Sequence, residues 1–135
     1  MTKAKTTYKP RLKRLELAEY PEAIAEVRAA IARLDQRMFQ LEEDIARRSA
    51  KFERWVSENT DLRNDTQRRA ALKEHRYTDS QYLGWLSLLQ NLKEQRIQQE
   101  IKLELLRGSF SVAKLQARQA IADLVAGDDG LSLVA

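Results

Sequence analysis

The sequence predicts an all-α fold in which two long amphipathic helices pair as an antiparallel, coiled-coil-like hairpin, with a short helix at the connecting tip. Only 4 Gly and 2 Pro occur among the 135 residues, and both residue types are unfavourable inside helices. Charged residues make up 33% of the chain, which is typical of solvated helix surfaces. Apolar residues recur every three or four positions over long stretches, and this is the period of one helix face.

The first long helix is expected from Pro21 to about Ser57. Pro is favoured as the first residue of a helix and disfavours helical backbone at the residue before it, here Tyr20. Apolar residues at heptad spacing predict a coiled-coil seam, which needs a long partner helix. Its one polar member, Arg48, must reach solvent or meet an acid on the facing helix. The seam consists of Ile24, Val27, Ile31, Leu34, Met38, Leu41, Ile45, Arg48, Phe52 and Trp55.

A polar segment, 58–79, separates the two long helices. Within it, a short helix is expected over roughly 66–76. Asn64 or Asp65 is the expected N-cap, because either side chain can accept hydrogen bonds from the backbone of the first turn.

The second long helix is expected from about Gln81 to Ala126, with Asp79 or Ser80 as its cap. Gly108 followed by Ser predicts a kink or break. This helix carries two apolar faces, which indicates two partners: the first long helix and a second subunit. The first face consists of Leu103, Leu106 and Phe110, and the face expected to form the oligomer interface consists of Ile97, Ile101, Leu105, Val112 and Leu115.

The predicted organisation is a flexible basic arm over 1–10, a helical domain over 11–126 and a tail over 127–135, where two glycines should end the helix. The helical domain should open with a short helix over 11–20. The net charge is +4, and residues 1–14 hold six basic residues and no acid. Such an arm contacts nucleic acid or an acidic partner, or serves as a solubilising tail. The sequence leaves these alternatives open.

Several classes of function are excluded or disfavoured. The chain has no Cys and a single His, His75, so disulfides and thiolate metal sites are excluded. There is no Gly-rich phosphate loop. We therefore expect that the protein is not an enzyme and that it binds neither a metal ion nor a cofactor. No apolar run approaches the ~20 residues of a membrane span, and the N-terminus lacks the apolar core of a signal peptide. We expect a cytoplasmic protein without a membrane partner.

The remaining chemical signal is basic and aromatic. Arg69, Lys73 and Arg76 are four and three residues apart and share one face of the short helix. Cations that follow a phosphate chain, next to aromatic rings that stack on bases, are the requirements of single-strand binding. The alternative is a solvated helix with structural aromatics, because the acids of the segment balance its basic residues. The aromatic residues expected near the same end are Trp55, Tyr82 and Trp85.

Two stretches, QRRAALKEHRY (67–77) and LLRGSFSVAKLQARQAI (105–121), resemble the small helical recombination mediator proteins of tailed phages, the UvsY type. The resemblance implies a ring-like, non-enzymatic homo-oligomer that binds single-stranded DNA. It also implies a role in loading a recombinase onto strands covered by single-strand binding protein. The DNA contacts it implies are Arg68, Arg69, Lys73, Arg76 and Tyr77 in the first stretch, with Arg107 and Lys114 in the second.

The arm lies outside this resemblance and is an electrostatic candidate for the same contact through Lys9, Arg11, Lys13 and Arg14. The function expected from the sequence is therefore a homo-oligomeric recombination accessory protein for single-stranded DNA. One alternative is a coiled-coil structural, adaptor or assembly protein that binds a protein partner. Another is an inhibitor that docks its basic arm on a protein. Whether the long helices pair within or between chains is open, because 58–79 is long enough for a swap.

Overall fold

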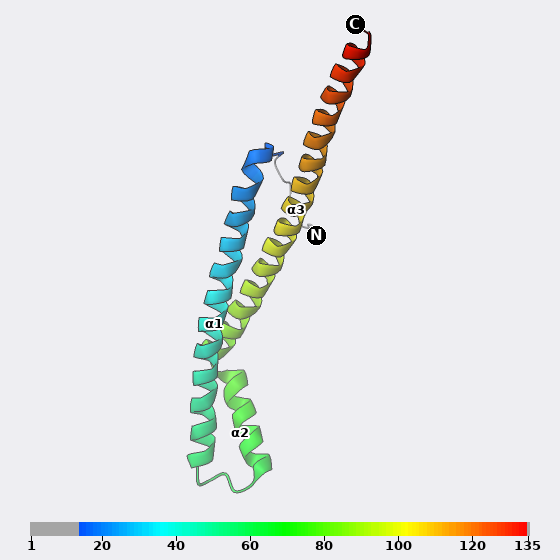
Figure 1. The fold of residues 1–135 in the computed structure, drawn as a ribbon. Coiled ribbons are helices and arrows are strands. Elements are labelled where there is room, and N and C mark those ends of the chain that lie inside the picture. Colours follow the sequence, from blue (N-terminus) through cyan, green and yellow to red (C-terminus); the bar gives the residue numbers. More distant parts are fainter. Residues whose placement is uncertain (1–13, 135) are drawn as a thin grey trace, which may run out of the picture. The chain divides into compact units, whose positions relative to one another are not determined.

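The computed structural model describes the backbone of residues 14–134 and the side chains of residues 14–127. This part of the chain contains no strand, which confirms the all-α prediction. Its elements are a 3-10 turn, Leu17–Glu19, and three helices (Figure 1): α1, Tyr20–Glu58; α2, Asp65–Thr78; and α3, Ser80–Val134.

The described residues divide into two compact units. The middle unit, 30–98, contains most of α1, all of α2 and the start of α3. The terminal unit joins the beginning of α1, within 14–29, to the long remainder of α3, within 99–134. Each unit has buried apolar residues of its own.

The beginning of α1 lies one residue earlier than predicted. Tyr20 precedes Pro21 but is helical, with φ −62° and ψ −44°. Its ring is buried and stacks on Phe110 of α3, with ring centroids 5.5 Å apart. This packing offsets the steric preference that Pro imposes on the preceding residue. The predicted helix over 11–20 is reduced, among the described residues, to the 3-10 turn Leu17–Glu19.

The break predicted as one possibility at Gly108 does not occur, and the predicted helix end at Gly127 is wrong. α3 continues through both glycines to Val134, so the expected tail over 127–135 is helical as far as it is described. Among the described residues, no glycine has a positive φ. Helical backbone at a glycine costs only about 1 kcal/mol relative to alanine, which the flanking helix formers can offset.

In the middle unit, the seam of α1 packs on the start of α3. Leu92 is only 2% exposed and packs with Leu34 and Leu41, so the expected packing of these two α1 residues on the second long helix is confirmed. Next to this cluster, Asp35 of α1 forms an ion pair with Arg96 of α3. Partly buried residues complete the cluster: Met38, Ile45, Trp85 and Leu89.

The last part of α1 has a different partner, α2. His75 of α2 stacks on Phe52 at 5.6 Å and meets Trp55 edge-on at 4.4 Å. The seam shifts by one residue here: Val56 is 5% exposed, whereas the predicted seam residue Trp55 is 49% exposed. The short helix therefore lies alongside the end of α1, and the loop 59–64 makes the turn (Figure 1).

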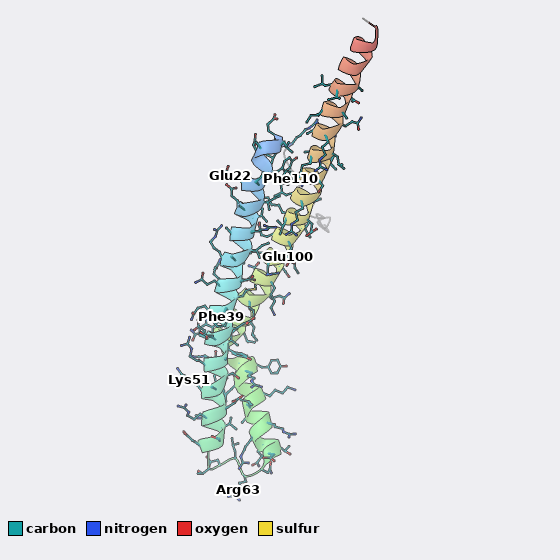
Figure 2. All side chains as sticks on the ribbon, in the orientation of Figure 1. Glu22, Phe39, Lys51, Arg63, Glu100 and Phe110 are labelled. Carbon is teal, nitrogen blue, oxygen red and sulfur yellow. The ribbon has the colours of Figure 1, made fainter. Side chains whose placement is uncertain are left out.

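In the terminal unit, the two predicted faces of α3 behave differently. On the first face, Leu106 is 3% exposed, and Phe110, labelled in Figure 2, meets the beginning of α1. The second face is exposed throughout, from Ile97 in the middle unit onwards. Its predicted members are 40–61% exposed: Ile97, Ile101, Leu105, Val112 and Leu115.

We expect Leu92→Ala to lower the free energy of unfolding by about 2–5 kcal/mol, because it removes buried methyl groups and leaves a cavity. Urea titration followed by circular dichroism measures the change. Leu88→Ala is the matched control, since Leu88 lies one turn earlier on α3 and is 40% exposed. An equal loss in both variants would contradict the assigned core.

Candidate nucleic-acid interface

The start of α2 is fixed by side-chain caps. The Asn64 side chain accepts a hydrogen bond from the backbone N–H of Gln67 at 2.8 Å. The Gln67 side chain in turn accepts from the backbone N–H of Arg63 at 2.7 Å. These bonds satisfy donors that a helix start leaves unpaired. The predicted cap at Asn64 is confirmed, and it sets where the basic face of α2 begins.

Asp79 alone separates α2 from α3 and holds three helices together. Its backbone N–H donates to the carbonyl of His75, which ends α2. Its carboxylate accepts from the backbone N–H of Tyr82 at 2.7 Å, which confirms the predicted cap of α3. The same carboxylate pairs with Arg48 of α1 through Nε at 3.3 Å and a terminal nitrogen at 2.5 Å. Arg48 thus meets an acid, one of its two predicted solutions.

This geometry lowers the pKa of the Asp79 carboxyl below its ordinary value of 3.8. The main cause is the hydrogen bond from Arg48, followed by that from the backbone N–H of Tyr82. The two side chains of the ion pair are 17% and 31% exposed. Hydrogen bonds to the ionised form favour that form, so the carboxylate stays charged to a lower pH than an ordinary aspartate does.

Just beyond this junction, α2 and α3 enclose a groove of about 430 Å³. Its α2 wall carries cations and a tyrosine, and its α3 wall carries a tyrosine and two leucines. We call it the α2–α3 groove. Its lining consists of Arg69, Leu72, Lys73, Arg76 and Tyr77 from α2, with Tyr82, Leu83 and Leu86 from α3.

The three cations of the groove are not equivalent. Arg76 donates to Ser49 at 3.1 Å and to Glu53 at 3.4 Å, so it also ties α2 to α1. Arg69 and Lys73 form no ion pair with any carboxylate among residues 14–127. These two cations are therefore the ones available to an external anion.

The aromatic rings of the groove also differ. Tyr77 is 67% exposed, and the Lys73 ammonium lies 5.8 Å from the centre of its ring. Tyr82 is half-buried and rests edge-on against Phe52 at 5.7 Å. An exposed ring beside unpaired cations and an apolar wall can accept a planar base and hold the adjacent phosphate.

The predicted residues are only partly brought together. Four of the five contacts expected in 67–77 line the α2–α3 groove, whereas Arg68 pairs with Asp65 at 3.1 Å and does not. The apolar lining was missed, although the spacing of Leu83 and Leu86 on one face of α3 indicated it. Trp85 packs against the core cluster, which favours the structural reading for that ring.

The other predicted contacts belong to the terminal unit or lie outside the described residues. Arg107 pairs with Glu104 at 3.2 Å, and the Lys114 ammonium lies 4.3 Å from the centre of the Phe110 ring. Arg14 borders a second groove, of about 980 Å³, along α3. The remaining arm residues Lys9, Arg11 and Lys13 lie outside the described residues.

Residues 14–127 hold no group of three or more His, Asp and Glu side chains placed to bind a metal ion. None of the described helices has a stretch long and apolar enough to cross a membrane. Comparison of the chain with protein-family models, curated proteins and solved structures finds no match. The α2–α3 groove and the faces of α3 are therefore the features of the molecule that bear on its function.

We expect the free energy of unfolding to fall as pH drops through the lowered pKa of Asp79. Because the pKa of Asp79 is lowered in the folded state, the ionised carboxylate stabilises the fold at pH values above the ordinary pKa of 3.8. This stabilisation is lost as the carboxylate is protonated at lower pH. Asp79→Asn should be less stable near neutral pH and should lack this part of the acid dependence. Unfolding midpoints measured across the acid range test this acid dependence. The control is Asp61→Asn, because Asp61 is an exposed residue of the loop between α1 and α2. Parallel pH profiles for wild type and Asp79→Asn would contradict the assignment.

Proposed function

We propose that this chain is a non-enzymatic accessory protein that binds single-stranded DNA through the α2–α3 groove and acts as a homo-oligomer. One observation carries the proposal: Arg69 and Lys73, which have no carboxylate partner among residues 14–127, border the same groove as the exposed ring of Tyr77. Cations and an open aromatic face side by side are the elements of sequence-tolerant strand binding.

In this proposal, Arg69 and Lys73 contact successive phosphates, and a base stacks on Tyr77. Each stacked base contributes about 1–3 kcal/mol. Single strands are favoured over duplex, because a base must leave its stack to lie against the tyrosine. The groove, of about 430 Å³, offers room for part of a single strand. Arg76 holds the wall of the groove through Glu53 and contributes positive potential.

The place of this activity in recombination is part of the proposal. Three residues of the groove's basic face lie within 67–77, one of the two stretches that resemble phage mediator proteins. By that resemblance, the oligomer would help a recombinase replace single-strand binding protein on DNA in the cytoplasm. The architecture that fits this role is the antiparallel, coiled-coil-like hairpin of α1 and α3, with α2 beside their connection.

A coiled-coil adaptor or assembly protein is the second candidate. The exposed apolar face of α3 favours it, because continuous apolar surface on a helix indicates a protein partner. The two candidates differ in their ligand. An adaptor would keep its partner when the α2–α3 groove loses its positive charge, whereas the DNA-binding protein would lose its strand.

We expect the double variant Arg69→Gln/Lys73→Gln to bind single-stranded DNA more weakly and with less dependence on salt. Loss of two phosphate contacts should reduce the slope of log affinity against log salt by about 1.4, at about 0.7 per contact. Fluorescence anisotropy with an oligothymidylate at several salt concentrations measures both quantities.

The matched control is Lys51→Gln/Arg54→Gln, which removes the same charge from exposed positions on α1 (Lys51 is labelled in Figure 2). Its affinity and salt slope should differ little from those of the wild type. Equal weakening in both double variants, or no binding by the wild type at low salt, would reject the groove as the DNA contact.

We expect Tyr77→Ala to weaken strand binding by about 5- to 150-fold, the equivalent of about 1–3 kcal/mol for one stacked base. Tyr77→Phe keeps the ring and should bind nearly as the wild type does. The same anisotropy titration compares the two variants. Similar affinities for Tyr77→Ala and Tyr77→Phe would mean that no base stacks there.

A further inference from the structure

One face of α3 in the terminal unit is apolar and uncovered. Ile101, Leu105, Val112 and Leu115 are 43%, 40%, 53% and 61% exposed, and we call them the α3 stripe. Their spacing keeps them on one side of the helix, at about 100° per residue. Leu106, on the opposite side, is 3% exposed. The stripe is therefore a second seam that the described part of this chain leaves without a partner.

Small residues continue the same line. Gly108 lies between Leu105 and Val112, and Ala122 and Ala126 follow after Leu115, all of them exposed. A Cβ at Gly108 would meet nothing within 4 Å, so packing within the chain does not require a glycine here. Glycine inside a helix costs about 1 kcal/mol relative to alanine. A glycine on the same line as the α3 stripe therefore fits the close approach of another helix.

The sizes along the line match those of a second, antiparallel copy. If Val112 lies opposite Leu115 of the second copy, two-fold symmetry determines every other pair. The remaining large or long side chains then face small ones: Ile101 faces Ala126, Leu105 faces Ala122, and Gln119 faces Gly108. A parallel copy would instead place Gly108 on Gly108 and Ala122 on Ala122, which leaves space unfilled.

Charge along the edge of the line agrees with this register. In coiled-coil seams, charged residues beside the seam pair with those of the facing helix. Lys102 follows Ile101 and Asp123 follows Ala122. The antiparallel register brings Lys102 near Asp123 of the second copy, and symmetry repeats the pair. Asp123 accepts a hydrogen bond from Gln119 at 2.9 Å, which holds it at this edge.

We infer that α3 pairs with α3 of a second copy of this chain, antiparallel, through the α3 stripe. The two-fold axis passes between Val112 and Leu115, and Gly108 and Ala122 accept the large side chains of the partner. The groove bordered by Arg14 and Leu17 runs along Leu105, Gly108 and Val112, so it would flank the docked helix. This inference rests on the homo-oligomer part of the proposed function and is independent of DNA binding.

Sedimentation equilibrium of the full chain tests the surface. The wild type should have the mass of an even number of 15.6 kDa chains, and Leu115→Glu should have half that mass or less. Ile121→Glu is the matched control, because Ile121 is 62% exposed and lies off the stripe. It should keep the wild-type mass. A monomeric wild type, or equal masses for wild type and Leu115→Glu, would overturn the inference.

Disulfide crosslinking tests the register, since the chain has no cysteine. Leu105→Cys/Ala122→Cys should form intermolecular disulfides on mild oxidation, and Leu105→Cys alone should not. Efficient crosslinking by Leu105→Cys alone would indicate a parallel pair and would overturn the proposed register. The failures remain separable: a dimer without DNA affinity rejects the proposed DNA contact alone, and a strand-binding monomer rejects the pairing alone.

Discussion

The ion pair between Arg48 and Asp79 determines how the middle unit is arranged. The Asp79 backbone ends α2, its carboxylate caps α3, and the same carboxylate holds Arg48 of α1. A charge placed in an apolar seam is unfavourable unless it is paired and hydrogen-bonded. Here the pairing also fixes the point at which α1 exchanges one partner helix for another. The α2–α3 groove lies immediately beside this junction, so its walls depend on that contact.

The two surfaces proposed to act in function are built on different physical principles. The α2–α3 groove combines an exposed ring with two cations that have no carboxylate partner among residues 14–127, so binding there would be electrostatic and sensitive to salt. The α3 stripe is apolar, and its interactions depend on buried area and on the fit of large to small side chains. The groove belongs to the middle unit and the stripe to the terminal unit. The proposed assembly and the proposed ligand binding can thus be tested by separate substitutions.

Local patterns predicted the helices well, because heptad spacing and cap residues depend only on neighbours in sequence. The seam, Asn64 as a cap and the two faces of α3 all follow from such patterns. The position of α2 beside α1 did not follow, since the exposure of Trp55 depends on which helix covers it. The predictions that α3 would break or end at its glycines failed for a related reason, because a continuing apolar pattern outweighs the weak helix propensity of glycine. The groove's basic face was predictable; the spacing of Leu83 and Leu86 indicated an apolar face on α3, but not that this face lies beside α2.

The exchange of partners along α1 has a consequence for the order in which the middle unit forms. The contacts between α1 and the rest of the unit span 23 residues at Arg76, 31 at Asp79 and 61 at Arg96. Loop closure costs more entropy as the closed loop lengthens. The hairpin of α1 and α2 thus has the lowest entropic cost of formation among these contacts. From Asp79 onwards, α3 can then pack against α1 progressively along its length.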